Sequence, residues 1–169
     1  MNNYKKILIV TICIFCLVGC DLSSKKIAEN NLKGRPMISL LDGGIRFIYA
    51  ENTGGMLSLG DKLADEFKFI IFQFIVAAFL VFLFVLLVVK KNIGHLQALA
   101  FILFISGGLG NLINRIFNDG KVIDFIVIKI FGVSTGIFNI ADIYVTIGIA
   151  IFIFANVFTK NKIVEENPA

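Results

Sequence analysis

The sequence predicts an all-α integral membrane protein with four transmembrane helices and a small β-rich cap at one membrane surface. Hydrophobic residues make up 57% of the 169 residues and charged residues only 17%, whereas about a quarter of a soluble domain is charged. The apolar residues are gathered in four segments separated by polar stretches. A chain of this length suits a single membrane domain, residues 1–169.

A helix needs roughly 20 apolar residues to span the hydrocarbon core of a bilayer. The second apolar segment meets this outright, because it contains no charged residue. The first is short and reaches a spanning length only by including Asp21 to Ile27, and the last carries one charge, Asp142. We expect the four spans at about residues 7–27, 69–89, 94–113 and 137–158.

The connections between the spans differ in length. Residues 30–66 are polar and contain two short β-like runs, Ile38–Leu41 and Ile45–Tyr49, around an Asp-Gly-Gly turn at residues 42–44. Such runs around a turn are typical of a β-hairpin, so this stretch is expected to form the cap. Only Lys90 to Ile93 join the second and third spans, which predicts a tight antiparallel helix pair.

The first span contains all three cysteines of the chain. Cys13, Cys16 and Cys20 follow helical spacing, and we interpret them as small side chains on a packing face. An alternative is a secretory signal, because Lys5-Lys6 and an apolar run precede the lipobox-like Leu17-Val18-Gly19-Cys20. Cys20 would then be lipidated and become the mature N-terminus. The spanning helix is favoured because three more spans follow.

The charge of the chain argues against a nucleic-acid partner. The net charge is only +4, and the 16 basic residues are scattered, whereas a nucleic-acid site needs a clustered basic patch. A basic excess of this kind suits contact with membrane phospholipid headgroups. Counting positive charges on the loops favours both termini inside the cell without deciding the matter.

Two aspartates lie in apolar surroundings and are the candidates for chemistry. Asp142 lies inside the fourth span, and Asp124 lies in the apolar run 122–128 that follows the third. Charge within a spanning segment is costly and indicates function. If the two carboxyl groups come close, repulsion and desolvation prevent both from ionising, so that one keeps a proton. An aspartic protease works with such a pair: one carboxylate accepts a proton from water and the other carboxyl polarises the peptide carbonyl.

Further polar residues gather at the same end of the last two spans. Asn111 and Arg115 share one helix face, and Asn139 and Asp142 share another. Glycines 107, 108 and 110 leave room for a second backbone beside Asn111. This grouping indicates a site.

Three alternatives remain at this point. An intramembrane aspartate can simply bond to a neighbouring helix or pair with Arg115. A small proton-coupled transporter would use Asp124 and Asp142 as proton relays, although transporters usually show internal repeats and none is visible here. A non-enzymatic assembly subunit would not explain why the polar groups gather at one end.

Five motifs in this chain resemble, in order, those of the bacterial lipoprotein signal peptidases, also known as signal peptidase II. The resemblance covers nearly the whole chain, and five blocks in the right order are a specific signal. The blocks are Asp21-Leu22-Ser23-Ser24-Lys25, Asn52-Thr53-Gly54-Gly55-Met56, the stretch from Gly107 to Arg115, the stretch from Gly120 to Ile126, and Phe138-Asn139-Ile140-Ala141-Asp142.

The resemblance implies a role for each of these residues. Asp124 and Asp142 would be the catalytic pair of an aspartic endopeptidase. The supporting and substrate-binding residues would be Asn52, Gly54, Asn111, Arg115, Asn139, Asp21 and Lys25. For Asp21 and Lys25, a solvated salt bridge at a helix end is an equally good interpretation. The glycine pairs 43–44 and 54–55 are further expected to clamp an extended substrate strand by backbone hydrogen bonds.

The resemblance also implies the substrate and the location. The substrate would be a prolipoprotein that already carries diacylglyceryl on its lipobox cysteine, cut just before that cysteine. No metal or cofactor is expected, and the protein is expected to act as a monomer. It would be a multi-pass protein of the bacterial cytoplasmic (inner) membrane, with cytoplasmic termini, an extracytoplasmic cap and an active site near the outer leaflet.

The chain departs from the family pattern at two places. Asn114 stands where the family usually has Asp, which weakens the transfer of a role to Arg115 beside it. Gly55-Met56-Leu57 replaces the usual Ala-Ala-Phe and would alter how the cap packs.

Overall fold

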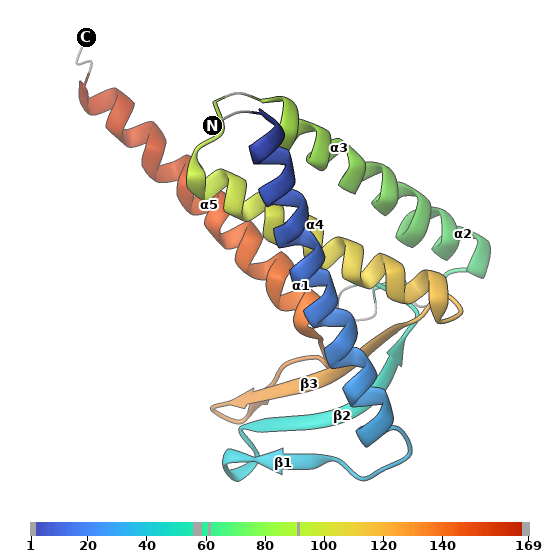
Figure 1. The fold of residues 1–169 in the computed structure, drawn as a ribbon. Helices are drawn as coiled ribbons and strands as arrows, with labels where there is room; N and C mark the ends of the chain where they lie inside the picture. The colour runs from blue at the N-terminus through green and yellow to red at the C-terminus, as the bar shows by residue number, and fades with distance from the viewer. Residues whose placement is uncertain (1–2, 56–58, 61, 91, 167–169) are drawn as a thin grey trace.

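The computed structural model describes residues 3–55, 59–60, 62–90 and 92–166. Within them, four helices are long and apolar enough to cross a membrane, as the sequence predicts. They are α1 (Asn3–Leu32), the continuous helix α2–η3–α3, α4 (His95–Phe117) and α5 (Ile140–Glu166). Figure 1 shows the start of α1 and the end of α5 at the end of the molecule opposite the β-sheet.

The helices start and end at different residues from those expected. The second span is a single helix made of α2 (Asp65–Phe69), the π-helical η3 (Ile70–Ile75) and α3 (Val76–Val89), so it starts before residue 69. α1 ends at Leu32 and α4 at Phe117, so both helices extend beyond the expected span ends at residues 27 and 113. Conversely, α5 starts three residues later than expected, because Asn139 is its N-cap.

Helix α4 lies at the centre and packs against α1, α3 and α5. It approaches α5 closely because two glycines face the partner backbone. A Cβ on Gly107 would overlap the carbonyl oxygen of Ala141, and a Cβ on Gly148 would lie 2.9 Å from the carbonyl oxygen of Ala100. Small residues allow this kind of close helix approach in membranes.

The face of α1 that packs against the bundle is not the cysteine face. Val10, Ile14 and Val18 are each 5% exposed and join a core cluster with residues of α3 and α4. Cys16 and Cys20 are exposed and Cys13 is half-buried, so the interpretation of the cysteines as packing residues is wrong for Cys16 and Cys20. This helix has two apolar faces, one with Val10, Ile14 and Val18 and one with the cysteines. The face with the branched side chains packs inward because these side chains bury more apolar surface than the thiols do.

The cap is a four-stranded antiparallel sheet in the order β1-β2-β3-β4. β1 (Ile38–Leu40) and β2 (Ile45–Asn52) form the expected hairpin around the turn. β3 (Val122–Ile130) and β4 (Val133–Ser134) come from the second connection, for which no strand is predicted from the sequence. The cap therefore draws on more of the chain than residues 30–66.

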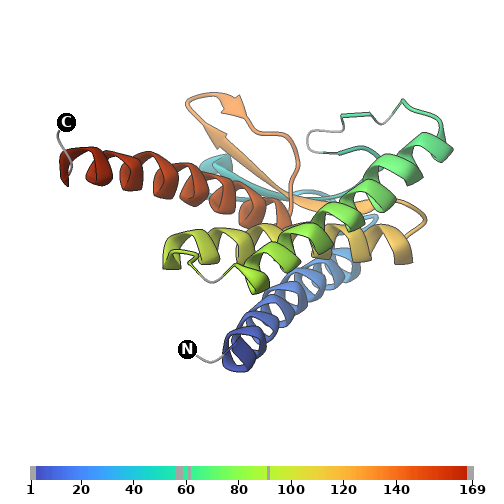
Figure 2. The same cartoon turned by 90° about the horizontal axis from the view of Figure 1, so that it is seen from above.

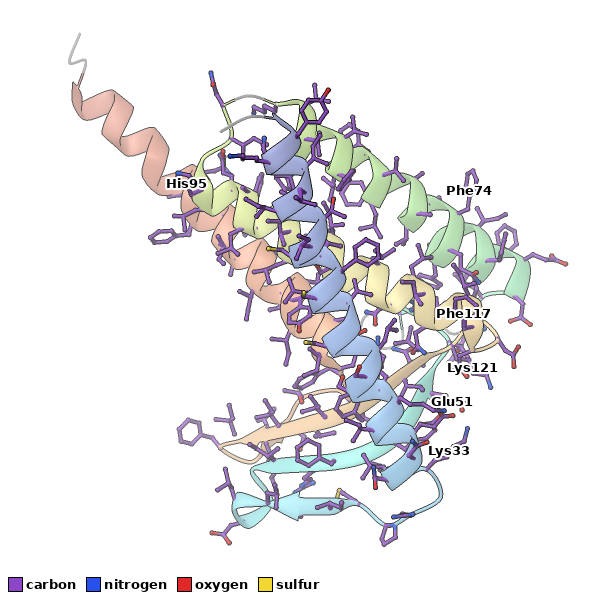
Figure 3. All side chains as sticks on the ribbon, in the orientation of Figure 1. Lys33, Glu51, Phe74, His95, Phe117 and Lys121 are labelled. Carbon is purple, nitrogen blue, oxygen red and sulfur yellow. The ribbon has the colours of Figure 1, made fainter. Side chains whose placement is uncertain are left out.

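The sheet is fixed to the end of α1. Ala28 and Leu32 of α1 are buried against Ile123, Phe125 and Ile126 of β3. One exposed ionic cluster reinforces this junction, because the carboxylate of Glu51 on β2 accepts hydrogen bonds from Lys33 and Lys121. Figure 3 shows these three side chains together beside the sheet, and His95 at the opposite end of the bundle.

Candidate functional site

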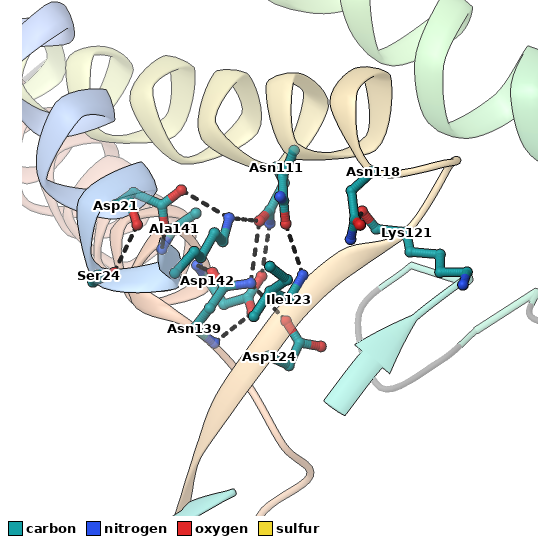
Figure 4. A network of polar contacts seen from close by, with 12 residues as sticks. Asp21, Ser24, Asn111, Asn118, Lys121, Ile123, Asp124, Asn139, Ala141 and Asp142 are labelled. Atoms are coloured by element: carbon teal, nitrogen blue, oxygen red, sulfur yellow. Dashed lines mark hydrogen bonds and ion pairs between the residues drawn. The ribbon is translucent and has the colours of Figure 1, made fainter. Parts of the chain in front are cut away.

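The nine residues that the sequence singles out come from five parts of the fold and meet where the helices join the sheet. Most of them belong to one hydrogen-bonded network, part of which Figure 4 shows. They are Asp21 and Lys25 on α1, Asn52 and Gly54 at the end of β2, Asn111 and Arg115 on α4, Asp124 on β3, and Asn139 and Asp142 at the start of α5.

Asn139 bridges the two aspartates. Its side-chain Nδ2 donates to Oδ1 of Asp124 at 2.6 Å, and its backbone N–H donates to Oδ2 of Asp142 at 3.0 Å. The N–H of Asp142 donates back to Oδ1 of Asn139 at 3.1 Å. This reciprocal pair is a capping box, in which the N-cap and the third helical residue satisfy each other's backbone donors. The start of α5 therefore holds both carboxyl groups at once.

Asp124 is the more buried of the two carboxyl groups, at 3% exposure. Burial raises the pKa of the Asp124 carboxyl to about 6, a hydrogen bond from Asn52 lowers it, and the charge of Asp142 adds to the increase. Nδ2 of Asn52 donates to Oδ2 of Asp124 at 3.0 Å. Asp124 can therefore hold a proton close to neutral pH, as a group that protonates a carbonyl oxygen must.

Asp142 is held on its other side by α4 and α1. Nδ2 of Asn111 donates to Oδ1 of Asp142 at 3.0 Å, and Nζ of Lys25 donates to Oδ1 of Asn111 at 2.7 Å. Lys25 also donates to Oδ2 of Asp21 at 2.7 Å, and the other oxygen of Asp21 accepts from the N–H of Ala141. A Cβ on Gly110 would overlap the Asp21 carboxylate.

Asp21 and Lys25 are 0% and 1% exposed. The alternative of a solvated salt bridge at a helix end is therefore wrong. A buried ion pair of this kind is worth little to stability by itself, whereas its contacts with Asn111 and with the backbone of α5 link it to Asp142.

Arg115 is buried but forms no ion pair with either aspartate among the described residues. Its Nη2 donates to the carbonyl oxygen of Gly54, and its guanidinium lies 5.3 Å from the ring centre of Phe72. The N–H of Gly54 donates to Oδ1 of Asn52 at 2.9 Å. Both backbone groups of Gly54 thus orient the site, and its N–H is not free to clamp a substrate strand.

The second expected clamp, Gly43-Gly44, lies at the other end of β2 from Asn52. It is too distant along the strand to bind a peptide at the aspartates. Met56 and Leu57, which replace the usual family residues, lie outside the described residues.

Two cavities meet at the pair of aspartates, and both are lined by Asn52, Asp124, Asp142 and Thr146. The larger, of about 580 Å³, lies between the start of α5 and the extended segment 134–138. The smaller, of about 250 Å³, lies between α4 and the helix α2–η3–α3, next to Arg115. Both carboxyl groups therefore lie on the walls of both cavities.

Sequence reasoning missed two backbone contributions. The N–H of Ile123 donates to Oδ1 of Asn114 at 2.7 Å, so Asn114 fixes the start of β3. The N–H groups of Phe125 and Ile126 both donate to the carbonyl oxygen of Phe138, which ties β3 to the segment before α5. Neither contact leaves a signal in a single sequence, because each uses main-chain groups.

A family model described as Signal peptidase (SPase) II matches residues 13–158. The chain belongs to the signal peptidase II family. The lipoprotein signal peptidase of Borrelia hermsii is 36% identical to it over 154 residues, covering 88% of this chain and 89% of that protein. The lipoprotein signal peptidase of Borrelia duttonii is 33% identical over 165 residues, covering 95% and 96%.

Solved structures share this signal peptidase II fold. A bacterial membrane enzyme structure at 2.3 Å resolution superposes with a TM-score of 0.78 at 26% identity, covering 90% of each chain. Another, at 1.9 Å, gives a TM-score of 0.70 at 30% identity, covering 86% of this chain and 90% of that one. Together with the four helices that are long enough to cross a membrane among the described residues, this family fits a multi-pass peptidase of the bacterial inner membrane.

Proposed function

We propose that this chain is an intramembrane aspartic endopeptidase that removes signal peptides from diacylglyceryl-modified prolipoproteins, cutting just before the lipidated cysteine. Asp124 and Asp142 are the catalytic pair. The relatives named above are lipoprotein signal peptidases, and that kinship supports this class of substrate over the proton-coupled carrier.

The observation that carries the proposal is the double contact of Asn139, which donates to one oxygen of each aspartate. Each carboxyl group keeps hydrogen-bond partners on one side and lines the same two cavities on the other. A carboxyl pair shared by one bridging residue and open to substrate is what general acid–base cleavage of a peptide needs.

The chemistry follows from a pair that shares one proton. The ionised carboxylate takes a proton from a water molecule, whose oxygen attacks the carbonyl carbon of the scissile peptide bond. The protonated carboxyl donates its proton to the carbonyl oxygen, giving a neutral tetrahedral diol. When the diol collapses, its C–N bond breaks and the nitrogen receives a proton, so one water is consumed for each bond cut.

The larger cavity offers a place for the substrate chain. Its walls are the backbone segment 134–138 and a mostly apolar face of α5 with Ile143, Thr146 and Ile147. The lipid on the cysteine would remain in the bilayer, while the bond before it reaches the aspartates. We further propose that the active site lies at the outer leaflet, with the sheet outside the cell and the termini in the cytoplasm, and that the protein works as a monomer.

The test is cleavage of a diacylglyceryl prolipoprotein by the purified protein in lipid. We expect Asp124→Asn and Asp142→Asn each to abolish cleavage while remaining folded. Asp119→Asn is the matched control, because it makes the same chemical change at an exposed aspartate outside the network. Full activity of Asp124→Asn or of Asp142→Asn would show that the substituted residue does not belong to the catalytic pair. A wild-type protein that cuts no lipidated substrate would favour the proton-coupled carrier.

A further inference from the structure

Both turns at the outer end of the sheet hold an apolar residue in the left-handed region of backbone space. Phe131, in the turn between β3 and β4, has a φ of 49°, and the next residue, Gly132, has a φ of 85°. Leu41, in the turn between β1 and β2, has a φ of 50°. Gly, Asn and Asp are the residues that normally occupy such positions, because a large side chain is strained there.

The strain at these two positions is not repaid by packing within the protein. Phe131 is 101% exposed and Leu41 is 76% exposed. An asparagine at either position would suit the left-handed backbone better, and little buried apolar surface would be lost. Strained residues that the fold itself does not require point to a function.

The two turns are neighbours and form one apolar surface. The N–H of Lys129 on β3 donates to the carbonyl oxygen of Gly44 at 2.8 Å, which brings the two turns side by side. Further exposed apolar side chains surround them. This surface, which we name the sheet tip, consists of Leu40, Leu41, Ile130, Phe131 and Val133.

The sheet tip projects beyond the helices. In Figure 1 the end of β3 extends sideways from the bundle, below the level of α5. In Figure 2, the view turned by 90° from that of Figure 1, the same hairpin lies outside the outline of the helices. Lipid or protein that lies beside the helices at the level of this hairpin would therefore contact the sheet tip.

The charged residues beside the sheet tip are mainly basic. Lys129 is exposed and Arg46 is partly exposed, and the one acidic neighbour in the turn is Asp42. Apolar and aromatic side chains flanked by Lys and Arg suit the boundary between lipid headgroups and acyl chains. Helix α5 is long and apolar enough to cross a membrane and also carries exposed apolar side chains, among them Ile149 and Ile153.

We propose that the sheet tip is a membrane anchor that inserts Phe131 and Leu41 into the interfacial region of the leaflet on the sheet side. The anchor holds the outer end of β3 at a fixed depth. Because segment 134–138, which starts at the last residue of β4, lines the larger cavity, the anchor also keeps that cavity open toward the same leaflet. The contact of the sheet tip with lipid does not depend on the proposed function, whereas its effect on cleavage does.

The chain contains no tryptophan, so a single introduced tryptophan reports from one place only. Phe131→Trp would be placed in vesicles of phosphatidylethanolamine and phosphatidylglycerol that contain a lipid with a nitroxide on its headgroup or its acyl chain. Arg35→Trp is the aqueous control, because Arg35 is exposed just past the end of α1. Ile153→Trp is the control within the bilayer.

We expect the emission of Phe131→Trp to be shifted to shorter wavelength than that of Arg35→Trp. We also expect the headgroup nitroxide to quench it several-fold more strongly than it quenches Arg35→Trp, and more than a nitroxide deep in the chain does. Emission and quenching equal to those of Arg35→Trp would overturn the proposal. Quenching of the tryptophan emission by nitroxide lipid that is seen only after a protein partner is added would also overturn the proposal.

A second variant separates anchoring from folding. Phe131→Asn together with Leu41→Asn places favourable turn residues at both positions, so the melting temperature in detergent should stay the same or rise. In vesicles we expect the KM for a lipidated prolipoprotein to rise several-fold, with cleavage in detergent unchanged. An unchanged KM in vesicles, or an equal loss in detergent and in vesicles, would contradict the anchor.

Discussion

Nζ of Lys25 lies 2.7 Å from Oδ1 of Asn111, and this contact decides which way the Asn111 amide faces. Lysine can only donate hydrogen bonds, so the oxygen of the amide must point toward it. Nδ2 of Asn139 also donates to that oxygen, at 3.2 Å. The amide nitrogen of Asn111 is therefore left to donate to Asp142. A lysine on the first helix thus orients a donor for a carboxyl group on the last.

Lys25→Met should abolish cleavage and also destabilise the fold. The substitution leaves Asp21 charged, buried and without its partner, which costs about 3–5 kcal/mol. Activity per folded molecule, measured after thermal unfolding has been recorded, separates the two effects.

The double variant Asp21→Asn with Lys25→Met removes both charges and keeps an oxygen to accept from Ala141. We expect it to recover most of the stability but not the activity, since nothing charged then orients Asn111. Recovery of both would mean that the ion pair serves only the fold.

Asn139→Ser should retain the fold and lose the activity. Serine is a good N-cap, so it can still accept from the N–H of Asp142, but its short side chain cannot reach Asp124. Asn139→Ala should lose activity as well and cost about 1 kcal/mol more in stability through the missing cap. Unfolding in detergent and cleavage in lipid measure these two quantities. An active Asn139→Ser would show that the bridge to Asp124 is dispensable.

Asn52→Ala should move the alkaline limb of the pH–rate profile to higher pH. The hydrogen bond from Asn52 lowers the pKa of Asp124, which burial raises to about 6. Removing that donor raises the pKa further, so the pair keeps its shared proton to higher pH. The profile of kcat against pH for the wild type and the variant is the measurement. A limb that stays in place, or moves to lower pH, would contradict this account.

Asn114→Asp should retain activity, because an aspartate can still accept from the N–H of Ile123. Asn114→Leu leaves that N–H without a partner, which costs about 1–3 kcal/mol and loosens the start of β3 two residues before Asp124. We expect lower stability and a lower kcat in the leucine variant alone. Equal behaviour of both variants would show that the start of β3 is fixed in another way.

The fold was largely predictable because the bilayer imposes its own length on each span. The uncharged run before Lys90 and the hairpin around residues 42–44 both give strong local signals. β3 gave none that separates it from a buried helix, because both of its faces are covered near Asp124 and its pattern is a continuous apolar run.

The candidate site was predicted as a set of residues and not as a geometry. Charge in apolar surroundings indicated Asp124 and Asp142. Burial of Lys25 could not be predicted, since a lysine near the end of a spanning helix usually reaches water. Its contact with Asn111 spans 86 positions of the chain and depends on how the helices pack.

Under the proposed function, in which the chain cuts before lipobox cysteines, the continuous helix α1 has a consequence for the chain itself. Its own Leu17-Val18-Gly19-Cys20 resembles the sequence that such an enzyme recognises. In α1 these residues lie in mid-helix, where their peptide groups are hydrogen-bonded. The next residue, Asp21, is fixed to the backbone of α5 by Ala141. Under the proposed function, the enzyme would thus carry a likeness of its substrate in which the peptide bond before Cys20 is held within a continuous helix.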